Sequence, residues 1–87
     1  MEEIVRTNVI AYIASFANMK PSNIKDDYIL KNHPLKIDDT NLGFLAIALR
    51  GYLKSLNPQE TVLATELRKK DTDVKKTYEL IIKKAGL

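Results

Sequence analysis

The chain has 87 residues, of which 45% are hydrophobic and 29% charged, and its formal net charge is +3. This length predicts a single domain over residues 1–87 and excludes a multidomain enzyme, because so short a chain buries only about 60% of its unfolded surface. The lack of cysteine excludes disulfides and thiolate chemistry. No apolar run approaches the roughly 20 residues of a membrane span, and the acidic start is unlike a signal peptide, so we expect a cytoplasmic protein without membrane association.

Residues 2–18 have the pattern of an amphipathic helix. Val5, Val9 and Ile13 recur at helical spacing and should face a core. The helix should end before Pro21, because proline disfavours the helical conformation of the residue that precedes it.

Residues 24–39 follow neither the helical nor the strand period, so we expect an irregular connection. Apolar residues should anchor it to the core: Ile24, Tyr28, Ile29, Leu30, Leu35 and Ile37. His33 has no second histidine or cysteine nearby, and the aspartates lack the spacing of a calcium loop. No metal site is predicted.

A second helix is predicted to begin among residues 38–41, which offer several possible caps, and to extend through Leu56. Its core stripe should consist of Leu42, Leu45, Leu49, Tyr52 or Leu53, and Leu56. Gly43 and Gly51 lie inside this helix, where each lowers helix stability by about 1 kcal/mol relative to alanine. They are either simply tolerated or allow another group to approach the helix closely.

Two more helix starts follow. Asn57-Pro58-Gln59-Glu60 has the pattern of a cap followed by proline at the first helical position, and the short helix should run to the basic residues 68–70. Its apolar residues are Val62, Leu63 and Leu67. A last helix should begin at Asp71-Thr72-Asp73 and reach about Lys84.

The fold class predicted from these segments is all-α. No segment of five or more residues alternates strictly between apolar and polar, and no hairpin dipeptide is present. Three principal helices and a shorter one should form a small four-helix bundle with a long loop between the first two helices.

The order of these parts resembles the acyl carrier protein family over nearly the whole chain. Three segments carry the resemblance: the loop anchors of residues 24–30, the carrier motif Asp39-Thr40-Asn41-Leu42, and the last-helix start Asp71-Thr72-Asp73-Val74. The resemblance implies a bundle of the acyl-carrier-protein type. It also implies that the residue before the motif leucine carries a 4'-phosphopantetheine arm on a serine hydroxyl.

The carrier position holds no serine in this sequence. It falls on Asn41, or on Thr40 if the motif shifts by one residue. An asparagine amide offers no hydroxyl for a phosphodiester, and the transferase that loads carrier proteins is expected to reject the extra methyl group of threonine. We therefore expect no cofactor unless Thr40 or another hydroxyl accepts the arm.

The second helix also differs from the family in charge. Members usually present acidic side chains there to partner enzymes, whereas residues 43–56 contain no acidic side chain. Because Phe44 and Ile47 lie off the core stripe, this helix is either deeply buried or exposes an apolar patch. The residues proposed to form a docking face for a protein partner are Leu42, Phe44, Ile47 and Arg50. Asp39 is expected to cap the helix.

The alternative function is nucleic-acid binding by the C-terminal half. Residues 45–87 carry 9 basic and 5 acidic side chains, and phosphate contacts dominate non-specific affinity. However, Asp71 and Asp73 at the start of the last helix would repel phosphate, and its lysines match an ordinary solvated face. With one histidine and no cysteine the chain lacks convergent catalytic groups, so we do not expect an enzyme. We also expect a monomer.

Overall fold

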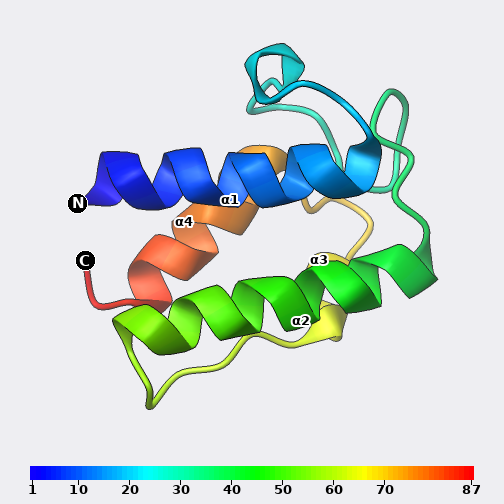
Figure 1. The fold of residues 1–87 in the computed structure, drawn as a ribbon. Coiled ribbons are helices and arrows are strands. Elements are labelled where there is room, and N and C mark those ends of the chain that lie inside the picture. Colours follow the sequence, from blue (N-terminus) through cyan, green and yellow to red (C-terminus); the bar gives the residue numbers. More distant parts are fainter.

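The computed structural model describes residues 1–87 and contains five helical elements and no β-strand (Figure 1). They are α1 (Glu2–Ala17), the 3-10 turn η1 (Pro21–Asn23), α2 (Asp39–Leu56), α3 (Ala64–Leu67) and α4 (Val74–Lys84). The prediction of an all-α bundle with three principal helices and a shorter one is confirmed.

The three long helices enclose one core. In Figure 1, α1 and α2 run in opposite directions, α4 crosses behind them, and the two chain ends lie on the same side. α1 packs on both α4 and α2, and α3 packs on α2. Nineteen buried hydrophobic residues form a single cluster, to which every helix and the long loop contribute.

α1 follows the predicted pattern closely. Val5, Val9 and Ile13 are fully buried, and the helix ends where Asn18 adopts a left-handed conformation with φ 55°. Asparagine is one of the few residues other than glycine that tolerates this conformation. The local chemistry of Asn18 therefore stops the helix shortly before Pro21.

The loop between α1 and α2 is irregular, as predicted, and is held by both side chains and backbone. Its apolar residues Ile24, Leu30, Leu35 and Ile37 are buried. Leu30 donates its backbone N–H to the Thr72 carbonyl at 3.0 Å, and Val74 donates to the Tyr28 carbonyl at 2.9 Å. The loop is thus attached to the start of α4.

The start of α2 corrects one prediction, because Asp38 caps the helix and Asp39 is its first residue. The Asp38 carboxylate accepts a hydrogen bond from the Asn41 backbone N–H at 2.8 Å. Asp39 instead places its carboxylate 3.3 Å from the Lys31 ammonium. Both aspartates are good caps by residue type. The ion pair with Lys31 engages the carboxylate of Asp39, and Asp38 caps the helix.

The start of the short third helix was predicted wrongly. Residues 57–60 form a turn, and α3 is a single turn that begins only at Ala64. The Asn57 side chain accepts from Gln59 N–H at 3.3 Å, which closes a local turn. In addition, Lys54 donates to the carbonyls of Pro58 and Glu60 at 3.3 and 2.9 Å, which ties the turn to the end of α2.

α4 begins and ends as predicted. Asp73 caps it by accepting from the Lys76 backbone N–H at 2.8 Å. Val74, Tyr78 and Ile81 are buried along one face, where they complete the core against α1.

The two glycines of α2 have different roles. A methyl group added at Gly43 would lie 2.9 Å from Arg68 Nη2, whereas one added at Gly51 would meet nothing within 4 Å. Close approach of another group is therefore found at Gly43 and not at Gly51.

Replacing Gly51 with alanine is expected to raise the free energy of unfolding by about 1 kcal/mol, because alanine loses less backbone entropy in a helix. Urea denaturation would measure the change. Gly43→Ala is the matched control, and its gain should be smaller because the Arg68 guanidinium has to move. A loss of stability in Gly51→Ala would contradict the open space at this position.

Candidate docking surface

The residues of the proposed carrier motif lie at the first turn of α2. Asp39, Thr40 and Asn41 are exposed, while Leu42 is fully buried in the core. The assignment of Leu42 to the docking face is therefore wrong. It points inward because it shares the stripe of Leu45, which is also fully buried.

Phe44 and Ile47 are exposed on α2, at 55% and 58% of their surface. The sequence left open whether α2 is deeply buried or exposes an apolar patch. The second alternative is found, because the outer face of α2 is apolar and uncovered. The two residues are separated by three positions and therefore lie next to each other on the helix. Arg50, three residues further, is half-buried.

The segment of residues 62–68 runs alongside α2. The Arg50 side chain donates from Nε to the Val62 carbonyl at 3.2 Å. At the other end, Arg68 donates from Nε and Nη2 to the Asp39 carbonyl at 3.1 and 2.6 Å. Ile47 lies four residues after Gly43, which faces Arg68, and three before Arg50, so it shares the helix face along which the segment runs.

Leu63 in this segment adds a third exposed apolar side chain, with 51% of its surface exposed. The predicted short helix contains it beside Val62, but only Val62 is buried. The signal that could have separated them is their adjacency, since consecutive residues of an extended segment point to opposite sides. We name Phe44, Ile47 and Leu63 the α2 apolar surface.

Three cations lie beside this surface and bind backbone carbonyls rather than carboxylates. They are Arg50, Lys54 and Arg68. None of them takes part in the ion pairs of the chain, which join Arg6 to Asp26, Lys31 to Asp39, Lys76 to Asp71 and Lys84 to Glu66. The carbonyls hold these three side chains in place without neutralising their charge.

Glu66 connects the segment of residues 62–68 to α4. Burial disfavours its charged form, but the hydrogen bonds from Leu63 N–H at 2.9 Å and Lys84 Nζ at 3.0 Å outweigh this and lower the pKa of Glu66. Lys84 also donates to the Thr61 carbonyl at 2.7 Å. The position of Leu63 therefore depends on contacts with α4.

Two of the nine basic residues of the C-terminal part are paired with carboxylates. Lys76 pairs with Asp71 at 3.2 Å, and this hydrogen bond lowers the pKa of Asp71. Lys84 pairs with Glu66. The positive charge available to phosphate on this side is therefore smaller than the sequence suggests.

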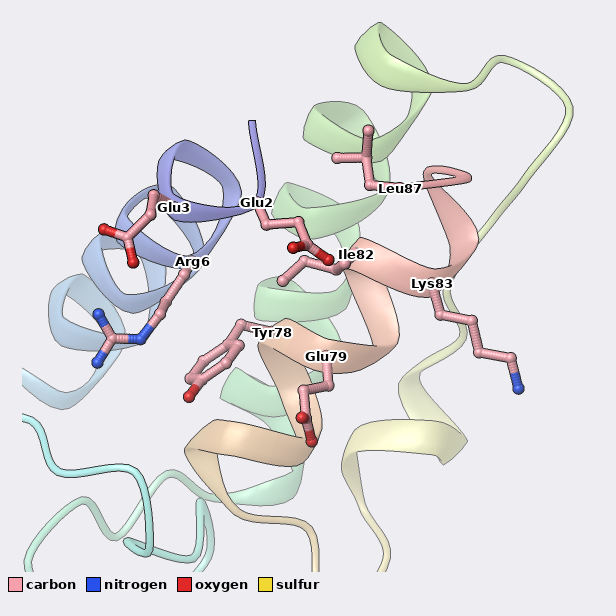
Figure 2. Close-up of a pocket in the computed structure, with 8 residues that line it drawn as sticks. All are labelled: Glu2, Glu3, Arg6, Tyr78, Glu79, Ile82, Lys83 and Leu87. Carbon is pink, nitrogen blue, oxygen red and sulfur yellow. The ribbon is translucent and has the colours of Figure 1, made fainter.

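A groove of about 490 Å³ lies elsewhere, between the start of α1 and the second half of α4 (Figure 2). It is lined by Glu2, Glu3, Arg6, Tyr78, Glu79, Ile82, Lys83 and Leu87. The Arg6 guanidinium lies 5.4 Å from the centre of the Tyr78 ring, and Tyr78 donates to Asp26 at 2.8 Å. Tyr78 and then Asp26 raise the pKa of Arg6. Of the charged side chains that line the groove, only Arg6 takes part in an ion pair, at 3.6 Å from Asp26.

Other predicted features remain apart from the α2 apolar surface. His33 is exposed in the long loop, and no group of three or more potential metal ligands comes together. Ser15, Ser22 and Ser55 are exposed at separate places in the chain. No helix has the length and apolar character needed to cross a membrane.

Comparison with known proteins gives no matching family model, no similar curated protein and no similar solved structure.

Proposed function

We propose that this chain is an acyl-carrier-protein-like interaction module that binds a protein partner through Phe44, Ile47 and Arg50. The observation that supports the proposal is the exposure of Phe44 and Ile47 on a helix whose opposite side forms the core. Contiguous apolar patches that a protein leaves exposed often mark interaction sites. Interfaces typically combine such an apolar centre with a polar rim, and Arg50 would supply part of that rim.

The order of helices supports the carrier-like part of the proposal. A long loop joins α1 to α2, and α3 is a short turn before α4, as the resemblance implies. The residues at the carrier position do not fit a phosphodiester-linked arm, because Asn41 has no hydroxyl and Thr40 is not a serine. The proposed function therefore requires no covalent carriage.

The binding part is tested by affinity capture from extracts of the source cells. A partner should be captured by the wild-type chain and by Ile4→Asp, but not by Ile47→Asp. The control is closely matched, because Ile4 on α1 is 57% exposed and Ile47 is 58% exposed. Melting temperatures should agree among the three proteins, since both substitutions are on the surface. Equal capture by Ile47→Asp would refute the assigned surface.

The carrier-like part is tested by intact mass after incubation with coenzyme A and a broad-specificity phosphopantetheinyl transferase. We expect Asn41→Ser to gain the arm and the wild-type chain to remain unmodified. Modification of the wild type would identify Thr40 or another hydroxyl as an acceptor. If neither protein is modified, the proposed relation to carrier proteins is wrong.

A further inference from the structure

We propose that the partner segment bound by the α2 apolar surface is acidic and apolar, with Asp or Glu side chains flanking the residues that contact Phe44, Ile47 and Leu63. The inference rests on the proposed function and specifies the chemistry of the partner. Its basis is the charge arrangement around the apolar side chains, which distinguishes this surface from the other exposed apolar residues.

Three cations lie along the border of the surface, which also contains Glu60 and the already paired Glu66. Lys54, Arg50 and Arg68 occur in this order along the seam between α2 and the segment of residues 57–68, as their carbonyl partners show. Residues 40–59 contain no carboxylate. No acidic side chain of α2 beyond its first residue therefore offsets these charges.

These cations are also held in position before a partner binds. Each donates to one or two backbone carbonyls of the chain, which reduces the side-chain freedom that binding would otherwise remove. A guanidinium has five N–H donors. Arg50 uses only Nε and Arg68 only Nε and Nη2 within the chain, so both keep donors for the paired hydrogen bonds that carboxylates accept.

The apolar centre favours a protein segment over nucleic acid. Phe44, Ile47 and Leu63 are each more than half exposed, and burying them requires apolar groups from the partner. The phosphate backbone has no apolar groups to supply. Carboxylates on an amphipathic segment satisfy both the centre and the border.

The experiment is a selection from a library of displayed random peptides on the wild-type chain, with Ile47→Asp as the counter-selected protein. We expect the enriched peptides to combine apolar residues with an excess of Asp and Glu. The best peptide, measured by fluorescence anisotropy, should bind roughly tenfold more weakly to the variant Arg50→Gln/Lys54→Gln. Its affinity should also fall moderately as salt is raised.

The matched control is Lys20→Gln/Lys25→Gln, which removes the same charge from exposed residues. Figure 1 places this segment beyond α1, on the side away from α2. The control should bind the peptide like the wild type. A loss equal to that of Arg50→Gln/Lys54→Gln would show a net-charge effect and overturn the inference.

The remaining outcomes separate the inference from the proposed function. Peptides that depend on Ile47 but carry no excess of acidic residues would overturn the inference and leave the proposed function standing. A failure to enrich any Ile47-dependent peptide would overturn both. Ile47-dependent binding to phosphatidylserine vesicles or to single-stranded RNA, without acidic peptides, would replace the protein partner with a different class of ligand.

Discussion

Leu49→Ala is expected to lower the free energy of unfolding by about 2–5 kcal/mol, whereas Ile47→Ala should change it by less than about 0.5 kcal/mol. The two residues lie two positions apart on α2, but Leu49 is fully buried and Ile47 is 58% exposed. Alanine at Leu49 removes buried methyl groups and leaves a cavity in the core. At Ile47 it removes atoms already in contact with water, and alanine is the stronger helix former.

Urea denaturation followed by circular dichroism measures both changes. A small domain has only about 5–15 kcal/mol of stability, so Leu49→Ala could unfold a substantial fraction of the chain. In that case Leu49→Met is measured in place of Leu49→Ala, and its free energy of unfolding should fall by less than about 1.5 kcal/mol. A large loss in Ile47→Ala would show that Ile47 belongs to the core and would remove the centre of the α2 apolar surface.

The core side of α2 could be predicted from the sequence, but its outer side could not. Leu42, Leu45 and Leu49 follow the helical period and are all buried. Phe44 and Ile47 make the helix apolar over much of its circumference, and periodicity alone does not reveal whether another element covers them. No element of the structure covers these two side chains, which are 55% and 58% exposed.

The helix-start patterns predicted the wrong first residues at two places, where other side chains stabilise a different arrangement. Asn57 followed by Pro58 is a favourable helix start, but the Lys54 ammonium and the Asn57 side chain stabilise a turn there. The choice of Asp38 over Asp39 as the cap has a similar origin, because Lys31 pairs with Asp39. These contacts join residues close in the sequence, but they compete with the helix-start pattern and are not revealed by it.

The border of the candidate site was also only partly predictable. Arg50 was recognised from its position on α2, but Arg68 was assigned to a basic cluster at the end of the short helix. Arg68 reaches the Asp39 carbonyl across 29 residues of sequence. The one local sign of this contact is Gly43, which gives the guanidinium room to approach.

The second large effect is expected in the long loop, where Leu30→Ala should lower the free energy of unfolding by about 2–5 kcal/mol. Leu30 is fully buried although it lies outside every helix. Its backbone N–H also joins the loop to the start of α4 by donating to the Thr72 carbonyl at 3.0 Å, and its carbonyl accepts from Ile37 N–H at 2.9 Å within the loop.

Leu63→Ala is the matched control, since it makes the same chemical change at a side chain that is 51% exposed, and its loss should stay below about 0.5 kcal/mol. Amide hydrogen exchange adds a local measurement. In Leu30→Ala, exchange should accelerate at Leu30, Val74 and Lys75, whose N–H groups bond between the loop and the start of α4. Similar losses in the two variants would show that the loop contributes little to the core. Unchanged exchange at Val74 would show that the start of α4 is stable without the loop anchor.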